Sequence, residues 1–369
     1  VKAYLNEEKK ENASLALLGE LDALRIPEHA YVNPETDAAH CCGHHAQMAG
    51  IFGAALALTV PEIAEKLGGQ VVFFATPAEE YGEIEFKNQL REQGKIRYGG
   101  GKCELIRTGA FDDIDLCLAH HIQPGDEIQV GSGTGNGFVS KVIRYLGKAA
   151  HAAGAPDKGV NALSAASLGL QALGLNRETF RDEDCVRIHP IITKGGNLVN
   201  VIPDEIVIET LVRAKTIEAF TDAAKKTDRS FQAGAVAMGA KVEITTLPGY
   251  LPTLAEQALP ELKRAAELAA PEVPVREAAG HSGGSTDVGD VQHLMPVYTF
   301  NTGGVKGGLH QINFEVTNEE EAYIDTAKMF ALAAYGLLKE KAARSKELVK
   351  NYTPVFKDSA EYTKFMEQF

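Results

Sequence analysis

The stretch VVFFATPAEE at residues 71–80 joins a short apolar run to a Thr-Pro turn and two adjacent glutamates. Similar short apolar runs occur at residues 15–18 and 116–119, and a longer amphipathic stretch, residues 47–67, lies between the first run and residue 71. Short runs of this kind are typical of buried strands, and their alternation with amphipathic stretches is typical of βαβ units. The sequence therefore predicts an α/β domain with a mostly parallel sheet and helices on both faces.

The composition limits the kinds of partner that the chain can have. The chain has 369 residues, 44% of them hydrophobic, and a formal net charge of -13. This length favours two domains. The negative charge argues against nucleic acid and against anionic membrane surfaces, both of which bind basic patches, and favours a small polar substrate.

Localisation is predicted from the same composition. No apolar stretch approaches the ~20 residues of a membrane span, and no signal segment is recognisable, so we expect a soluble, cytoplasmic protein. An odd number of cysteines, five, favours reduced thiols over disulfides. The chain begins at Val1 rather than Met, and processing, proteolysis or an incomplete sequence would each explain this.

A second module is predicted after the glycine-rich stretch at residues 131–137. Its patterns predict strands at 138–146, 187–193, 206–213 and 241–246 and helices at 160–173 and 217–238. This β-α-β-β-α-β order is typical of a ferredoxin-like α+β fold. The first pattern then returns, with helices expected at 254–270 and 319–341, a strand at 297–300 and a docked terminal helix. We therefore expect a main domain from residues 1–131 and 248–369, with 132–247 inserted into it.

Metal-binding residue types occur where the first long helix is expected to begin. Cys42 and His44 flank Gly43, so a sharp turn there can direct both side chains to one ion. A thiolate and a neutral imidazole are good zinc ligands. The alternative interpretation, a buried thiol and a capping histidine, stays open on this motif alone.

Further polar residues follow the other predicted strands. Glu79 and Glu80 follow one strand and His121 follows another, while His310 follows a glycine-rich loop. Ligands bind such sheets at the carboxyl ends of the strands, so the side chains of Asp22, Glu79, Glu80 and His121 are expected to converge. Two neighbouring carboxylates repel unless a cation or a proton separates their roles. The alternative is a solvated Glu-Glu pair.

Several motifs together resemble one enzyme family. Residues 19–24 are similar to its Asp-Ala-Leu strand end, residues 40–44 to its His-Ala-Cys-Gly-His motif, and residues 77–80 to its Pro-Ala-Glu-Glu motif. The family is the dinuclear-metal amidohydrolases and exopeptidases, which include aminoacylases, auxin-conjugate hydrolases and p-aminobenzoyl-glutamate hydrolases. Residues 99–102, 109–115 and 284–290 most resemble the aminobenzoyl-glutamate hydrolase branch.

The resemblance implies a zinc-exopeptidase-like catalytic domain that binds two divalent ions, zinc or manganese. It implies a bridging role for Cys42, a general-base role for Glu79 and an orienting role for Asp22 beside a ligand histidine. His121 is favoured over His120, because the family ligand stands three residues before a proline. The implied metal ligands are Cys42, His44, Glu80, His121 and His310.

In the inserted module, which the resemblance identifies as a lid, His151 is similar to the family histidine that holds the oxyanion, often across a dimer interface. Asn200 and Arg213 resemble lid positions that grip a substrate carboxylate. A turn-capping asparagine and a surface ion pair are the alternatives. The resemblance also implies a homodimer formed through the lid.

Some positions depart from the family pattern. Cys41 replaces a small residue and His45 replaces an acidic or amide residue. Residues 25–37 and 83–98 lengthen two loops beside the expected site. Loops at such places usually set specificity, so no single relative gives the substrate.

The sequence therefore predicts a dimeric, metal-dependent amidohydrolase that cleaves the amide of a small N-acyl or N-aroyl amino acid or a dipeptide-like compound. A dipeptidase or aminopeptidase is the nearest alternative. An aryl-amine aminohydrolase and an inactive binding protein of the same fold are the others.

Overall fold

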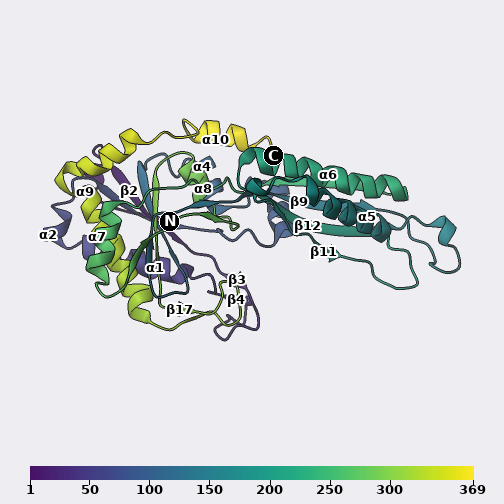
Figure 1. Cartoon of the computed structure of the whole chain (residues 1–369), viewed down its shortest axis with the longest axis horizontal. Helices are drawn as coiled ribbons and strands as arrows, with labels where there is room; N and C mark the ends of the chain where they lie inside the picture. Colours follow the sequence, from purple (N-terminus) through teal and green to yellow (C-terminus); the bar gives the residue numbers. More distant parts are fainter.

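A seven-stranded sheet forms the centre of the larger of two modules in the computed structural model, which describes residues 1–369 (Figure 1). The pairs β2–β5, β2–β6, β6–β16 and β7–β14 are parallel, and β1–β5 and β7–β16 are antiparallel. In sheet order, the strands are β1 (Lys2–Leu5), β5 (Gln70–Thr76), β2 (Ser14–Glu20), β6 (Leu116–Ile122), β16 (Val297–Thr302), β7 (Ile128–Val130) and β14 (Val275–Glu277).

Both faces of this sheet are buried, which explains why its central strands are almost continuously apolar. Leu15 and Leu17 of β2 pack into the core on one face, and Ala16 and Leu18 pack into the core on the other. The first face is covered by α1 (His44–Leu58), α7 (Pro260–Ala269) and α9 (Thr326–Asn351), and the second by α4 (Gly101–Arg107), α8 (Val288–Gln292) and α10 (Ser359–Met366).

The second module is a separate antiparallel sheet with two long helices, and it extends away from the larger module (Figure 1). Its sheet order is β10-β12-β9-β13, and β11 also pairs with β12. Side chains of Asn161 and Thr216 cap its two helices. Its elements are β9 (Gly137–Leu146), α5 (Ala162–Leu175), β10 (Arg187–Ile188), β11 (Ile191–Lys194), β12 (Glu205–Ala214), α6 (Ile217–Met238) and β13 (Lys241–Pro248).

The predicted fold class is confirmed: a mostly parallel α/β sheet and a ferredoxin-like second module. We call the second module the lid. The remaining short elements connect these parts, and they are β3 (Leu24–Arg25), β4 (Ala38–Ala39), α2 (Pro61–Ala64), α3 (Ile84–Glu92), β8 (Thr134–Gly135), β15 (His281–Ser282), β17 (Val305–Lys306), β18 (Glu315–Val316), the 3₁₀-helices η1 (Glu7–Lys9), η2 (Pro156–Lys158), η3 (Asn176–Thr179) and η4 (Asp182–Asp184), and the π-helix η5 (Glu320–Asp325).

Several predicted boundaries were wrong. The helix expected from residue 254 begins at Pro260, because Glu256 is extended and forms a β-bridge with Ser132. The helix expected over 319–341 is instead η5 followed by α9, whose φ and ψ are not helical at residues 339–342. The lengthened segment at 83–98 contains α3 rather than only loop. None of the helices combines the length and the apolar character needed to cross a membrane.

Candidate metal centre

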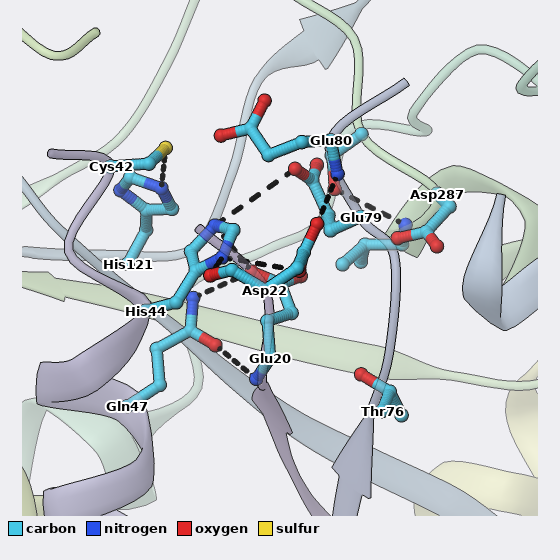
Figure 2. Close-up of polar contacts among 12 residues, drawn as sticks. Glu20, Asp22, Cys42, His44, Gln47, Thr76, Glu79, Glu80, His121 and Asp287 are labelled. Atoms are coloured by element: carbon cyan, nitrogen blue, oxygen red, sulfur yellow. Dashed lines mark hydrogen bonds and ion pairs between the residues drawn. The ribbon is translucent and has the colours of Figure 1, made fainter. Parts of the chain in front are cut away.

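The candidate site lies where three parallel strands end and α1 begins. Glu20 is the last residue of β2, Glu79 and Glu80 follow β5, and His121 is the second-last residue of β6. Cys42 precedes α1 by two positions, and His44 is the first residue of that helix. The predicted convergence at the carboxyl ends of the strands is therefore observed (Figure 2).

Gly43 makes the turn between Cys42 and His44 possible. Its φ is 89°, in the left-handed region that disfavours side chains. A Cβ added there would lie 2.0 Å from Cγ2 of Ile122 on β6. The absence of a side chain thus lets the helix start approach the strand that carries His121.

Cys42 is the residue shared by two groups of metal-binding atoms. One group consists of Cys42, His44 and His121, and the other of Cys42, Glu80 and His310. The Cys42 Sγ lies 3.4 Å from His121 Nε2 and 3.2 Å from His310 Nε2. His310 Nε2 also lies 3.2 Å from Glu80 Oε1. This arrangement suits two ions that share one thiolate.

The donor atoms themselves fit divalent metals. A thiolate, imidazoles and a carboxylate form the mixed S, N and O set that zinc accepts. Glu80 Oε1 and His44 Nε2 are buried and make no hydrogen bond of good geometry, although Glu80 Oε1 lies 3.2 Å from His310 Nε2 and His44 Nε2 lies 3.1 Å from Glu20 Oε2. Buried polar atoms without partners are rare, and a metal ion would satisfy both.

Adjacent residues of a strand point to opposite faces, and this separates the two histidines of β6. His121 points toward Cys42. The His120 Nε2 instead lies 2.8 Å from Thr302 Oγ1 and 3.3 Å from Thr326 Oγ1, in a fully buried position. His121 is thus placed to bind an ion beside Cys42, whereas His120 packs within the core.

Asp22 lies against His44. Its Oδ1 is 3.3 Å from His44 Nδ1, and its Oδ2 accepts a hydrogen bond from the Glu80 N–H at 2.8 Å. Although burial opposes it, hydrogen bonding to His44 and to the Glu80 N–H lowers the pKa of Asp22 to about 2. Burial likewise opposes the shift of His44, but Asp22 and Glu20 raise its pKa to about 9. Asp22 therefore positions both a histidine and the turn of the glutamate pair.

Negative charge is concentrated around the thiol. Burial, together with the charges of Glu20 and Asp287, raises the pKa of Glu79 well above its usual range. Burial and the charges of Glu80 and Glu79 likewise raise the pKa of the Cys42 thiol. Divalent cations would reverse both effects by favouring the deprotonated forms.

The turn that carries the two glutamates is held on several sides. Ala78 has a φ of 56°, which is unfavourable for a residue with a side chain. Its carbonyl accepts the N–H of Gly101 at 2.9 Å, and the Glu79 carbonyl accepts the Tyr250 hydroxyl. Lys87 Nζ donates to the Glu80 carbonyl at 2.7 Å. These bonds compensate the strain and fix the direction of both carboxylates.

A cavity of about 880 Å³ opens over this cluster. Its lining includes Glu79, His121 and His310 from the larger module and Arg213 from the lid. Arg213 forms no ion pair, and its guanidinium carbon lies 5.8 Å from the centre of the Phe138 ring. The surface ion pair considered for Arg213 is therefore not found.

The comparisons with known proteins agree with this geometry. The model of peptidase family M20/M25/M40 matches residues 16–335, most of the chain. The chain belongs to this family. The expected membership is confirmed at the level of this peptidase family.

Among curated M20/M25/M40 relatives, the chain is similar to the Xaa-Arg dipeptidases of Mus musculus (28% identity) and Homo sapiens (29% identity). Each match covers 82% of this chain and 64% of the relative, so the chain spans less than two thirds of their length. One of the subunits of the Escherichia coli p-aminobenzoyl-glutamate hydrolase is 29% identical over 54% of this chain and 39% of the relative. The expected place in that branch therefore stays a prediction.

Solved structures support the fold. A dinuclear metal binding peptidase of the M20 family from Bacillus subtilis has a TM-score of 0.59 and 23% identity, with 88% of this chain and 82% of that chain covered. The aminobenzoyl-glutamate utilization protein of Klebsiella pneumoniae has a TM-score of 0.62 and 19% identity, covering 92% and 75%.

Two lid residues lie away from the metal centre of this M20/M25/M40 chain. His151 and Asn200 are adjacent in space, because His151 pairs with Val201 and Ala152 donates its N–H to the Asn200 carbonyl. Both are exposed, and neither lines the cavity. Within one chain, the structure thus brings Arg213 to the cavity but not His151 or Asn200.

Three residues around the candidate metal centre were not predicted from the sequence, namely Glu20, Lys102 and Asp287. Glu20 Oε2 lies 3.1 Å from His44 Nε2, and Lys102 Nζ lies 2.6 Å from both Glu20 and Asp287. Glu20 is the last residue of an apolar strand, and this position could have indicated that it lies at the site. Lys102 and Asp287 belong to motifs noted for their resemblance, but no local pattern indicates that the two lie together.

Proposed function

We propose that this chain is a metal-dependent hydrolase that cleaves the amide bond of a small N-acyl or N-aroyl amino acid or a dipeptide-like substrate. One observation carries the proposal: two groups of metal-binding atoms share the Cys42 thiolate beside the partly exposed carboxylate of Glu79.

The site residues divide into ligands and a base. Cys42, His44 and His121 would hold one ion, and Cys42, Glu80 and His310 the other. When bound, two divalent ions would polarise the scissile carbonyl and lower the pKa of the attacking water. Zinc or manganese is proposed, since availability as well as ligand type decides which metal is bound.

Glu79 is the proposed general base. Its carboxylate accepts a proton from the attacking water as the C–O bond forms, and it delivers this proton to the leaving nitrogen as the C–N bond breaks. Its carbonyl is fixed by Tyr250 and its side chain lines the cavity, so the carboxylate can stay aimed at the reacting atoms. Asp22 orients His44, as carboxylates commonly do for metal-binding histidines.

A substrate carboxylate is the proposed partner of Arg213. Arg213 lines the cavity without an acidic partner, and Arg187 lies directly opposite it on the neighbouring strand. Like charges in such cross-strand pairs repel, so an anion bound between lid and site would relieve the repulsion. A guanidinium suits a carboxylate because it can donate two parallel hydrogen bonds.

The carboxylates that line the cavity indicate whether the amine end of the substrate is free or acylated. Its carboxylates are Glu20, Glu79 and Glu80, of which Glu20 is paired with Lys102 and the other two belong to the metal centre. None is left free for a substrate ammonium group. This favours a blocked, acylated amine over the free amine of a dipeptide.

A dipeptidase is the second candidate function. The similarity to Xaa-Arg dipeptidases over 82% of the chain favours it. Their name indicates a C-terminal arginine, whose carboxylate Arg213 would equally accept.

A homodimer formed through the lid is proposed as the active form. β11 lies at a sheet edge, with Ile191 and Ile192 exposed, and Leu198 and Val199 are exposed on the following loop. In such a dimer, His151 and Asn200 would reach the cavity of the second chain, where His151 would hold the oxyanion and Asn200 the substrate carboxylate. The five free cysteines support a reducing, cytoplasmic location.

The test is hydrolysis of a panel of acylated amino acids, p-aminobenzoyl-glutamate and dipeptides by protein loaded with zinc or manganese. Wild-type protein should release the amino acid from an acylated substrate. Glu79→Gln should keep its metal and lose at least ~10²-fold in kcat. Faster cleavage of dipeptides would favour the second candidate, and full activity of Glu79→Gln would show that the base is another residue.

A further inference from the structure

Lys102 is the most deeply buried cation near the metal centre, and no step proposed above uses it. Its side chain is 1% exposed. The ammonium lies 2.6 Å from Glu20 Oε1 and 2.6 Å from Asp287 Oδ1, and the Lys102 N–H donates to Asp287 Oδ2 at 2.8 Å. Burying three charges is costly unless they are paired in good geometry, so this arrangement calls for an explanation.

Glycines bring Lys102 to this position. A Cβ on Gly100 would lie 2.2 Å from the Tyr250 ring, and a Cβ on Gly101 would lie 1.5 Å from the Pro77 carbonyl oxygen. The start of α4 therefore packs directly against the turn of the glutamate pair. The Gly101 N–H bonds to the Ala78 carbonyl in the same contact, one residue before Glu79.

On its other side, the ion cluster leads to a metal-binding histidine. Glu20 Oε2 lies 3.1 Å from His44 Nε2 and accepts a hydrogen bond from Gln47 at 2.8 Å. Figure 2 shows Glu20 between Gln47 and His44, with Asp287 beside Glu79. Lys102 is thus linked to His44 through one carboxylate and to the Glu79 turn through its own helix.

We propose that Lys102 is a positioning residue for hydrolysis: its ammonium holds the Glu20 carboxylate in place beside the His44 imidazole, and its helix start fixes the Glu79 turn. The inference rests on the proposed function. Removing the ammonium would leave Glu20 and Asp287 to repel each other and Glu79, so His44 and the general base would both lose their alignment.

Lys141 offers a matched control for the loss of a buried lysine. Its side chain is also 1% exposed, and its ammonium lies 2.7 Å from Asp228 and 2.8 Å from Thr246. It lies in the lid sheet, outside the metal centre. Lys102→Met and Lys141→Met therefore both remove a buried ammonium, but Lys141 has one acidic partner, which is partly exposed, in place of two buried ones.

The experiment measures kcat, KM, thermal unfolding and metal affinity by chelator competition. Lys102→Met should lower kcat and metal affinity each by ~10- to 100-fold, with KM little changed, as expected for a group that supports a metal-binding histidine. Lys141→Met should be less stable than wild type but should keep the wild-type kcat and metal affinity. An equal loss of kcat and metal affinity in both variants would overturn the proposal.

A double variant separates positioning from charge balance, and it covers the case in which Lys102→Met does not fold. Lys102→Met with Asp287→Asn has the same net charge in the cluster as the wild type. It should fold, yet keep the low kcat and the low metal affinity. Wild-type values in the double variant would overturn the proposal. Metal affinity needs no substrate, so it tests Lys102 even if the proposed reaction is wrong.

Discussion

Single residues at this site are held by charge. Asp22 and Glu20 contact opposite nitrogens of one imidazole, that of His44. Glu79 lies close enough for its charge to raise the pKa of His44 further. Such crowding of acids is stable only with compensating cations, and Lys102 and the proposed metal ions supply them.

Asp22→Asn should weaken metal binding without abolishing it. The amide oxygen can still accept the Glu80 N–H, but the charge beside His44 is lost. We expect metal affinity to fall ~10- to 100-fold in chelator competition. Asp37→Asn, which removes a surface partner of Arg25, is the control and should bind metal normally. Unchanged affinity in Asp22→Asn would show that the carboxylate does not support His44.

We expect the stability of the protein to depend on pH through Glu256, which lies outside the candidate metal centre. Burial raises its pKa from the ordinary 4.5 to about 8, although Thr299 donates two hydrogen bonds to it. The folded state then keeps a proton that the unfolded state has released. The free energy of unfolding therefore falls as pH rises from 4.5 to about 8, by roughly 3 kcal/mol up to pH 7.

Urea unfolding of wild type and Glu256→Gln at several pH values tests this. The glutamine cannot ionise, so the difference in stability between the two proteins should grow in favour of Glu256→Gln between pH 5 and pH 8. A difference that does not change with pH would mean that Glu256 titrates normally.

The sequence located most of the residues that converge at the candidate metal centre, because strand ends and helix starts are recognisable from local patterns. From the sequence, His121 could be preferred over His120 only because of the resemblance to the enzyme family. The structure gives the physical reason: the two side chains point to opposite faces of β6, and only His121 faces Cys42. The Lys102 cluster was not predictable, since its two acidic partners are 82 and 185 residues away in the chain. Only the folded arrangement brings them together.

Among the elements, α4 packs directly against the turn that carries Glu79 and Glu80. Gly101→Ala should destabilise the protein by ~3 kcal/mol or more, because the new Cβ would overlap the Pro77 carbonyl. It should also lower kcat, since the Glu79 turn must move. Gly174→Ala in α5, where a Cβ meets nothing within 4 Å, is the control and should be neutral or stabilising. Equal stabilities of the two variants in urea would contradict the packing described here.

Element types were predicted better than their ends. Short apolar runs predicted the lid strands and β2, β5, β6 and β16 of the larger sheet, but not β1, β7 and β14. The start of α7 depends on the bridge between Glu256 and Ser132, which lie 124 residues apart in the sequence. Likewise, Pro190 separates β10 from β11, although the pattern predicted one strand. The start of α7 is set by a long-range contact, and the break between β10 and β11 is set by a proline. Neither can be read from the spacing of apolar residues, from which the elements were predicted.

At the scale of the whole molecule, the exposed edge of the lid predicts self-association. Ile192→Asp on β11 should convert a dimer into monomers of 39.6 kDa, because a buried charge at the edge opposes strand pairing. Phe52→Asp on α1 of the larger module, also exposed, should stay dimeric. Sedimentation velocity distinguishes these outcomes, and a monomeric wild type would refute the proposed dimer.

The central claim is that one thiolate is shared by two metal ions. Metal analysis of protein purified without chelator, then dialysed against zinc or manganese, tests it most directly. Wild-type protein should contain close to two divalent ions per chain, and Cys42→Ala should lose both, since Cys42 belongs to both groups of ligands. Metal-free wild-type protein that cannot be reloaded, or two ions retained by Cys42→Ala, would contradict the account.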